Sequence, residues 1–347
     1  MNLRVGLIAP PFESVPPRLY GGTERVVWEL ARGLNAAHVE TVVFASGDST
    51  VPGRLIATTP EALRLKRPAI QDAGPFQFQM LSLVKKHADQ VDILHNHNDY
   101  WMLPLHQMVQ TPMVTTLHGR LDLPELPVAL RSEPKASFIS ISRAQREPIP
   151  DLKWARTIHH GLDLTRFQFN PRPGNYLAFL GRISPEKRPD LAVQIALQAQ
   201  IPLKIAAKIE PGRDREYYDA RVAPHVDGKF IEYIGEISES EKSDFLGGAL
   251  ALVFPIDWPE PFGLVMIEAL ACGTPVLARP FGSVPEVLEN GVTGFINSDP
   301  SQLARLAREA ALLDRLRCRE TAAQRFSIER VIEEHLEVYR WILNSKS

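Results

Sequence analysis

The sequence predicts an α/β protein built from two doubly wound parallel sheets in tandem. Short apolar runs alternate with segments of helical periodicity from end to end, which is typical of a parallel sheet covered by helices. A stretch rich in Pro, Asn and Gly at 167–175 interrupts the alternation like a linker, and the alternation then starts again. Two such units leave a cleft between them, and ligands of such sheets bind at the carboxyl ends of the strands.

The apolar runs predict the individual strands. In the first unit we expect strands at 3–9, 41–45, 91–94, 113–117 and 137–141, with helices at 23–34 and 76–86. In the second unit we expect strands at 176–180, 203–207, 230–233, 249–254 and 275–278. The last helix, 327–343, is acidic on one side and apolar on the other, so it needs a surface to cover. These elements predict domains at 1–167 and 168–325, followed by a terminal helix segment at 326–347.

Composition and charge exclude several classes of protein. The chain has 347 residues, 44% of them hydrophobic, and a net charge of -2, which indicates a globular protein nearer two domains than one. Residues 1–167 hold 18 Lys and Arg against 16 Asp and Glu, which leaves 21 against 25 for the remainder. Values near +2 and -4 do not indicate nucleic-acid binding, and they disfavour peripheral contact with a membrane.

Cysteine content and apolar runs predict the cellular location. Cys272 and Cys318 are too few and too far apart for a disulfide framework or a zinc site, so a reducing cytosol fits best. The opening residues, MNLRVGLIAPPFE, have only a short apolar run, which indicates a first strand and not a signal peptide. No stretch approaches eighteen apolar residues, so we expect no transmembrane segment and a cytoplasmic protein.

Two acids in an otherwise apolar segment, WPEPFGLVMIEALACGTPVLAR at 258–279, are the first candidate site residues. With Pro261 at the first helical position, Glu260 stands at the helix entrance, where unpaired amides can bind a phosphate or a sugar hydroxyl. Glu268 follows about 12 Å along the helix axis, where a carboxylate is costly to bury without a partner. The two could bind hydroxyls at both ends of a sugar-diphosphate-ribose molecule. The alternative is a capping acid and a helix glutamate paired with an arginine.

Cations and glycines follow the first strand of each unit. Arg182 and Lys187 come just after the strand at 176–180, where they suit a diphosphate, although a solvated cationic loop is the alternative. Gly21 and Gly22, after Tyr20, open the first helix, where glycine lets an anionic ligand approach the backbone. The alternative there is a tight turn with Thr23 as the N-cap.

Histidines gather in the first unit. His95, His97 and Asp99 are close in sequence, His106 follows, and His118 ends the predicted strand at 113–117, so it should point into the cleft. A zinc site is the alternative to polar histidines at strand ends. No HExxH or paired CxxC motif supports it, so we expect no metal ligands.

Taken together, these residues and Ala271-Cys272-Gly273-Thr274-Pro275-Val276 resemble the family 4 retaining glycosyltransferases of the GT-B fold. The resemblance covers nearly the whole chain and is strongest, without a gap, at 235–295. Weaker matches are DILHNH at 92–97 and HHGLD at 159–163, where the family usually has Asn-Gly-Val-Asp. The terminal FSIERVIEEHLEVY corresponds to the family's helix that crosses back over the N-terminal domain, which would cover its apolar face.

The resemblance implies a role for each candidate residue. Glu260 would contact the hydroxyls of the donor sugar and Glu268 those of the ribose, while Arg182 and Lys187 would hold the diphosphate. The backbone of the helix start would bind sugar and phosphate through Phe262, Gly263, Leu264 and Val265. The glycine pair Gly21 and Gly22 would lie near the donor phosphate, His118 would lie beside the transferred sugar, and Tyr233 and Ile234 would border the base. The stretch 206–212 lacks the family's glycine-rich turn, which leaves the base and ribose contacts there open.

The resemblance also implies the reaction. A hexose would move from a UDP-, GDP- or ADP-sugar to an acceptor hydroxyl with retention, with His118, Arg182, Lys187 and Glu260 as the catalytic residues. The N-terminal domain would bind the acceptor, a saccharide, a lipid-linked saccharide or a small metabolite, and the C-terminal domain the donor. No DxD motif occurs in the sequence, so we expect transfer without a metal ion or other cofactor.

Three other functions share parts of this pattern. A nicotinamide oxidoreductase is also doubly wound, but GxGxxG is missing after the first strand. A sugar-nucleotide epimerase or a phosphorylase could have the same two-domain architecture. A non-catalytic nucleotide-sugar binder is the third, and the intact acids and cations argue against it.

Overall fold

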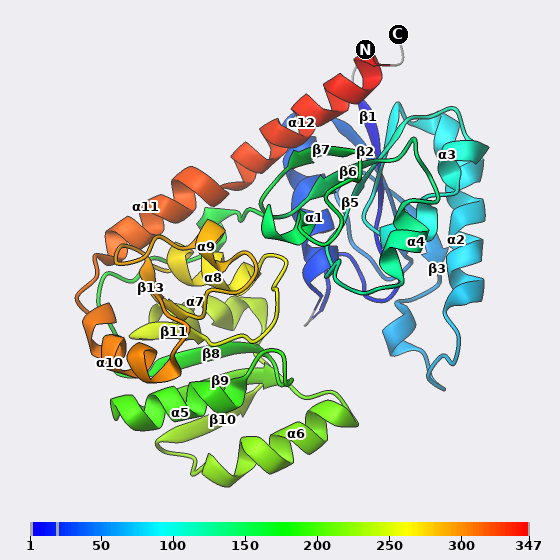
Figure 1. The fold of residues 1–347 in the computed structure, drawn as a ribbon. Coiled ribbons are helices and arrows are strands. Elements are labelled where there is room, and N and C mark those ends of the chain that lie inside the picture. The colour runs from blue at the N-terminus through cyan, green and yellow to red at the C-terminus, as the bar shows by residue number, and fades with distance from the viewer. Residues whose placement is uncertain (1–2, 19–20, 346–347) are drawn as a thin grey trace. The chain divides into compact units, whose positions relative to one another are not determined.

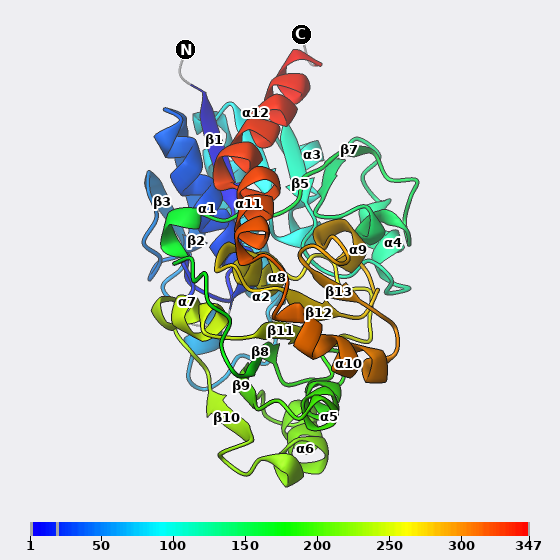
Figure 2. The ribbon, with the colours of Figure 1, turned by 90° about the vertical axis from the view of Figure 1, so that its left-hand side faces the viewer.

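The computed structural model describes residues 3–18 and 21–345, which form two compact units. The N-terminal unit comprises Met1–His160 and Ile328–Ser347, and the C-terminal unit comprises Gly161–Ser327. Each unit has one fully parallel sheet with helices packed on it (Figure 1 and Figure 2). The predicted α/β fold class, with two doubly wound parallel sheets, is confirmed.

The N-terminal sheet has seven strands in the order β3-β2-β1-β4-β5-β6-β7. The order runs outward from β1 to β3 and then returns to β4 on the other side of β1. The carboxyl ends of β1 and β4 therefore form the switch point at which ligands of such sheets bind. The strands are β1 (Arg4–Ile8), β2 (Glu40–Ser46), β3 (Arg54–Thr59), β4 (Ile93–Asn96), β5 (Met113–Thr116), β6 (Ser137–Ser140) and β7 (Trp154–Thr157).

Among the residues that the structure describes, five helices and several short 3-10 turns connect and cover this sheet. The helices are α1 (Gly22–Ala36), α2 (Gly74–His87), α3 (Leu105–Met108), α4 (Leu126–Leu130) and α12 (Ile328–Asn344). The turns are η1 (Leu63–Leu65), η2 (Ala88–Gln90), η3 (Asp99–Met102) and η4 (Ala144–Arg146). The expected helices at 23–34, 76–86 and 327–343 match α1, α2 and α12, but Gly21 and not Thr23 is the N-cap of α1.

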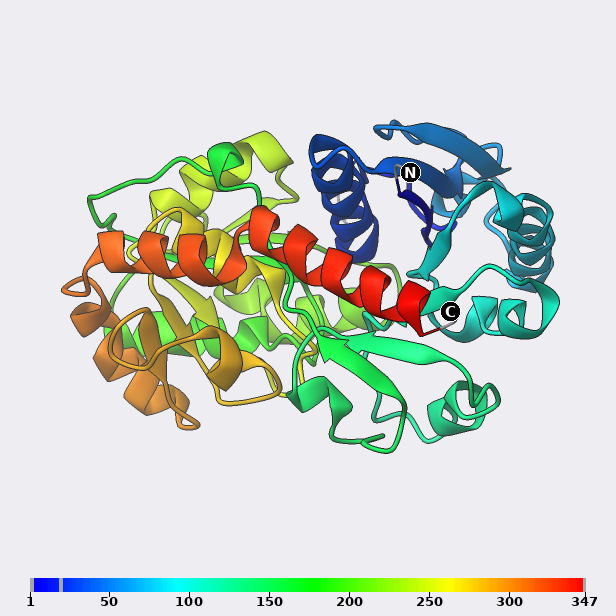
Figure 3. The same cartoon turned by 90° about the horizontal axis from the view of Figure 1, so that it is seen from above.

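Helix α12 belongs to the N-terminal unit, although it follows the whole C-terminal unit in sequence. Its apolar face, which includes Val331, Ile332 and Tyr339, lies in one buried cluster with α1 and the sheet. The two helices approach closely, because a β-carbon added at Gly33 of α1 would lie 2.5 Å from Cγ1 of Ile332. Figure 3 shows the start of α12, in red, beside α1, in blue.

The C-terminal sheet has six strands in the order β10-β9-β8-β11-β12-β13, with its switch point between β8 and β11. Helices α5 and α10 pack together on one face, and α8 lies on the other between α7 and α11 (Figure 1). The strands are β8 (Leu177–Arg182), β9 (Leu203–Lys208), β10 (Ile231–Gly235), β11 (Ala251–Phe254), β12 (Val276–Ala278) and β13 (Gly294–Ile296). The helices are α5 (Pro189–Ala199), α6 (Arg213–Arg221), α7 (Glu239–Gly247), α8 (Leu264–Ala271), α9 (Val284–Val287), α10 (Pro300–Ala310) and α11 (Arg315–Phe326), with turns η5 (Leu164–Arg166) and η6 (Ala223–His225).

Three strands were not predicted from the sequence, and all three are sheet edges: β3, β7 and β13. Edge strands pair on one side only and need no continuous apolar run, so their sequences carry a weak signal. The stretch 167–175, expected as a linker, is a packed segment of the C-terminal unit. There the amide of Asn170 donates to the carbonyl of Cys272 at 3.1 Å, and its side chain donates to the carbonyl of Gly247 at 2.9 Å.

Candidate functional site

The start of α8 lies later in the chain than its sequence predicts. The helix begins at Leu264, with Gly263 in a left-handed conformation (φ 79) before it, so Pro261 is not at the first helical position. A β-carbon at Gly263 would come within 2.9 Å of Met266 and Phe254, so both φ and space require glycine here. The amide of Met266 donates to the carbonyl of Gly263 at 3.0 Å, while the amides of Leu264 and Val265 precede every carbonyl that the helix could offer them, and such amides favour an anion.

Glu260 lies in the loop before α8 with its carboxylate already bound. Its side chain is buried and accepts hydrogen bonds from Nζ of Lys187 and, at 2.8 Å, from Nε1 of Trp258. The ammonium of Lys187 also lies 5.2 Å from the ring centroid of Trp258. The backbone of Glu260 is fixed as well, because Gly282 packs against it and the amide of Ser283 donates to its carbonyl at 3.0 Å.

Glu268, whose burial posed the question of a partner, is paired with a lysine from the neighbouring helix α7. The residue is 3% exposed, and its Oε1 lies 2.8 Å from Nζ of Lys242. Lys242 also lies 2.6 Å from Oε1 of Glu239, one turn earlier on α7. A paired helix glutamate was the alternative reading of this residue, but its partner is a lysine and not an arginine.

Arg182, at the end of β8, faces an acid from α6. Its Nε lies 3.3 Å from Oδ2 of Asp214, and 40% of its side chain is exposed. Burial raises the pKa of Asp214, although the charge of Arg182 opposes that change. The guanidinium is therefore only partly occupied by Asp214 and accessible to a ligand.

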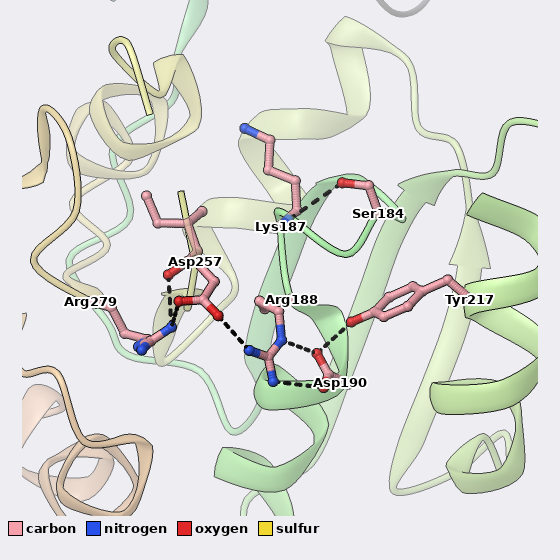
Figure 4. Close-up of polar contacts among 8 residues, drawn as sticks. Ser184, Lys187, Arg188, Asp190, Tyr217, Asp257 and Arg279 are labelled. Carbon is pink, nitrogen blue, oxygen red and sulfur yellow. Dashed lines mark hydrogen bonds and ion pairs between the residues drawn. The ribbon is translucent and has the colours of Figure 1, made fainter. Parts of the chain in front are cut away.

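Ion pairs fix the two loops that carry Lys187 and Glu260 (Figure 4). Asp257 accepts from Nη1 of Arg188 at 2.8 Å and from Nη1 of Arg279 at 2.7 Å. Arg188 also donates to both oxygens of Asp190, at 2.9 and 3.0 Å. These bonds hold Arg188 in a left-handed conformation (φ 54) that costs about 1 kcal/mol without glycine.

A hydrogen bond and a backbone contact extend this arrangement. The hydroxyl of Tyr217, from α6, donates to Asp190, as Figure 4 shows, and the amide of Asp257 donates to the carbonyl of Glu186 at 2.9 Å. The hydrogen bond from Arg279 lowers the pKa of Asp257. The loop after β8 and the loop after β11 are thus joined on both sides of Lys187.

The residues expected to border the base lie on β10. The hydroxyl of Tyr233 donates to the carbonyl of Ala207 at 2.9 Å, and its ring lies 5.1 Å from that of Tyr218. Ile234 is 37% exposed, which is unusual for an isoleucine in a sheet. Strand β9 ends at Lys208 in the stretch without the family's glycine-rich turn, and Lys208 pairs there with Glu210 at 2.8 Å.

Two expected donor-site glycines and the expected histidine belong to the N-terminal unit. Gly21 caps α1 and Gly22 is its first residue, while Tyr20 lies outside the described residues. His118 follows β5, and its Nε2 lies 2.9 Å from Nδ1 of His97. Both histidines follow neighbouring strands of one sheet, so this contact lies within the N-terminal unit.

His97 and His118 are part of a row of buried histidines in the N-terminal unit. His95 bonds the hydroxyls of Tyr339 and Thr116, each at 2.7 Å, and His335 of α12 lies 5.3 Å from it, ring to ring. The ring of His160 stacks on that of His118 at 5.3 Å. His106 lies on α3.

Burial keeps these histidines uncharged. Burial first, and then charge repulsion from the other histidines, lowers the pKa of His95, His97, His118 and His160 well below the ordinary value. Burial lowers the pKa of His335 to about 4. Among residues 3–18 and 21–345, no cluster of His, Cys, Asp and Glu side chains has an arrangement that could hold a metal ion.

The side chains that hold the predicted residues were not predicted themselves. Lys242, Trp258, Asp257, Asp214 and Arg279 each contact a candidate residue or its loop. A sequence signal existed only for Trp258, which stands two residues before Glu260. The other partners come from distant segments, such as Lys242, which is 26 residues from Glu268.

Comparison with protein families covers both units. Residues 20–166 match the family described as Glycosyltransferase Family 4, and residues 163–325 match the one described as Glycosyl transferases group 1. The chain belongs to the family 4 glycosyltransferases. It is therefore an enzyme that transfers a sugar from a nucleotide-sugar donor, which favours the transferase over the oxidoreductase, epimerase and binding-protein alternatives.

Similar proteins include enzymes whose names describe different activities. The D-inositol 3-phosphate glycosyltransferase of Frankia alni is 29% identical, over 83% of this chain and 77% of that protein. The glycogen synthase of Mycobacterium tuberculosis is 27% identical, over 84% of this chain and 82% of that protein.

Solved structures of similar proteins show the fold. The Anabaena protein HepE, solved in complex with UDP-glucose, aligns with a TM-score of 0.75 at 18% identity, over 97% of this chain and 99% of that one. This likeness agrees with the GT-B fold of the family.

Within the described part of the chain, no helix combines the length and apolarity that crossing a membrane requires.

Proposed function

We propose that this glycosyltransferase moves a hexose from a UDP-, GDP- or ADP-sugar to an acceptor hydroxyl, with retention of the anomeric configuration and without a metal ion. The ion pair between Lys187 and Glu260 supports this proposal most directly. The pair lies beside the start of α8, where helix amides favour an anion. A diphosphate would draw Lys187 away from Glu260 and so free the carboxylate to accept from sugar hydroxyls.

The remaining donor contacts follow from the same placement. Glu268 would accept from the ribose hydroxyls, and Arg182 would exchange Asp214 for a phosphate oxygen. Backbone groups of Phe262 to Val265 would bind sugar and phosphate, while Tyr233 and Ile234 would border the base. The complex of HepE with UDP-glucose makes UDP the first nucleotide to test.

The proposed transfer is an exchange on one face of the sugar. The bond from the anomeric carbon to the β-phosphate oxygen breaks, the bond to the acceptor oxygen forms, and the acceptor proton passes to the departing phosphate oxygen. Negative charge develops on that phosphate, and Arg182, Lys187 and the helix amides, once they have bound the donor, stabilise this charge from the positions they then hold. From the N-terminal unit we propose His118 as a neutral hydrogen-bonding contact of the transferred sugar.

The test begins with nucleotide binding. UDP, GDP and ADP are compared by calorimetry, and the tightest should bind Glu268→Ala at least tenfold more weakly than the unaltered protein. Glu309→Ala, an exposed acid on α10, is the control and should leave the affinity unchanged. Equal affinity in both variants would remove Glu268 from the proposed site.

The absence of a metal requirement is tested by activity. Transfer or slow donor hydrolysis, measured by product analysis, should be unchanged after EDTA, because fixed cations neutralise the diphosphate. Activity that disappears with EDTA and returns with Mn²⁺ would contradict this reasoning.

A further inference from the structure

Lys242 is held in a defined position by the start of α7. Ser238 and Glu241 form a capping box, in which the amide of Ser238 donates to Oε2 of Glu241 at 2.8 Å. This box fixes the first turn of the helix, and Lys242 is the next residue. Only 15% of its side chain is exposed, so most of the side chain lies among protein groups.

The ammonium bridges two carboxylates. Nζ lies 2.6 Å from Oε1 of Glu239 and 2.8 Å from Oε1 of Glu268. The other oxygen of Glu268, Oε2, forms no hydrogen bond with any residue that the structure describes. A carboxylate with one oxygen fixed and one available presents a single, defined acceptor to a ligand.

Helix α7 also follows the strand expected to border the base. The chain leaves β10 at Gly235, in a left-handed conformation (φ 80), and reaches the α7 cap three residues later. Lys242 therefore ties the segment after Tyr233 and Ile234 to the carboxylate on α8. This contact connects two parts of a nucleoside site, the base edge and the ribose carboxylate.

We propose that Lys242 is a positioning residue for nucleoside recognition: it orients Glu268 so that Oε2 accepts from the ribose hydroxyls. The inference rests on the proposed function of Glu268. In this proposal Lys242 acts through Glu268 and not on the ligand, since its ammonium faces the carboxylates of Glu239 and Glu268. Its substitution should change recognition of the ribose and leave the phosphate contacts of Arg182 and Lys187 in place.

A purely structural role for Lys242 predicts a different result. In that case Lys242 would only compensate the buried charge of Glu268, and its loss would lower the free energy of unfolding without selecting one part of the ligand. A ligand without ribose hydroxyls separates the two roles. The suitable probe is the 2′,3′-dideoxy analogue of whichever of UDP, GDP and ADP binds tightest.

The experiment measures dissociation constants by calorimetry for the natural nucleoside diphosphate and its dideoxy analogue. The unaltered protein should bind the analogue about tenfold more weakly, as expected when a hydrogen bond to a charged group is lost. Lys242→Met should bind the natural nucleotide about tenfold more weakly and the analogue as the unaltered protein does. Lys242→Arg should restore most of the preference, and Glu239→Gln, which removes only the other carboxylate, should retain it.

Activity gives a second readout. Lys242→Met should raise the KM for the donor about tenfold and change kcat by less than threefold, since the leaving diphosphate keeps its cations. Thermal unfolding of each variant shows whether it is folded, and Lys242→Gln replaces Lys242→Met if the latter is not.

The outcomes separate this inference from the proposed function. If Lys242→Met and Lys242→Gln keep the preference for the natural nucleotide while Glu268→Ala loses it, Glu268 binds ribose without Lys242 and the inference is wrong. If Lys242→Met weakens both ligands equally, the residue is structural and the inference is also wrong. If the unaltered protein does not distinguish the two ligands, the proposed ribose contact of Glu268 fails together with the inference. If it binds none of UDP, GDP and ADP, the proposed donors fail as well.

Discussion

Acidification should destabilise the N-terminal unit through His335, on α12. The side chain is 5% exposed, its ring lies 5.3 Å from that of His95, and its Nδ1 lies 2.7 Å from the carbonyl of Val331. Burial lowers its pKa from an ordinary 6.5 to about 4. Between these values the unfolded chain binds a proton that the folded chain does not bind, so stability falls as the pH falls through this window.

The size of the effect follows from these two values. Lowering the pH from 7 to 5 should reduce the free energy of unfolding by about 2 kcal/mol through His335 alone. Domains are stable by only about 5–15 kcal/mol, so the change is measurable. Glu24 and Asp99 act in the opposite direction, because burial raises their pKa to about 7 and about 6. Comparison with a variant at residue 335 cancels their contribution.

The assay is urea unfolding at pH 7 and pH 5, followed by tryptophan fluorescence. Four of the five tryptophans, at positions 28, 101, 154 and 341, belong to the N-terminal unit, so the signal reports mainly on it. His335→Gln and His335→Phe should each lose about 2 kcal/mol less than the unaltered protein between the two pH values. His38→Asn is the control, since His38 is exposed and asparagine tolerates its positive φ of 61. A pH dependence shared by all four proteins would refute the reasoning.

Three other substitutions test the site and the packing. Arg182→Ala should lower kcat at least tenfold, because a cation that stabilises the leaving diphosphate is lost; an unchanged kcat would exclude this role. Asp257→Asn should lower the free energy of unfolding of the C-terminal unit by about 1 kcal/mol, and with it the urea midpoint, since Arg188 and Arg279 lose a shared partner. The donor KM should rise for the same reason. A normal midpoint and a normal KM would show that the two loops keep their positions without Asp257. Gly33→Ala should destabilise the N-terminal unit by about 1–3 kcal/mol, because the added methyl meets Ile332 at 2.5 Å. In an Ile332→Ala background, where the side chain that the methyl meets is shortened, Gly33→Ala should cost less than it does alone, and an equal or larger cost would contradict the steric explanation.

The sequence by itself determined the alternation of buried strands and helices. Central strands such as β1, β4 and β11 are buried on both faces, so they need continuous apolar runs that can be recognised without a partner. The edge strands β3, β7 and β13 escaped prediction because the pairing that makes them strands comes from a neighbour, not from their own residues. The predicted start of α8 was wrong for a related reason. Packing of Gly263 against Phe254 and Met266 decides where the helix begins.

The identities of the candidate acids and cations were also determined by the sequence, through their spacing. Only the tertiary structure decided which charge neutralises which: Lys187 holds Glu260 from 73 residues away, and Lys242 holds Glu268 from another helix. The histidine row depends on folding to the same degree, because His95 bonds Tyr339 across 244 residues. Spacing along a strand or helix follows from local geometry, whereas pairing between distant side chains exists only once a sheet and the helices packed on it bring them within a few ångströms.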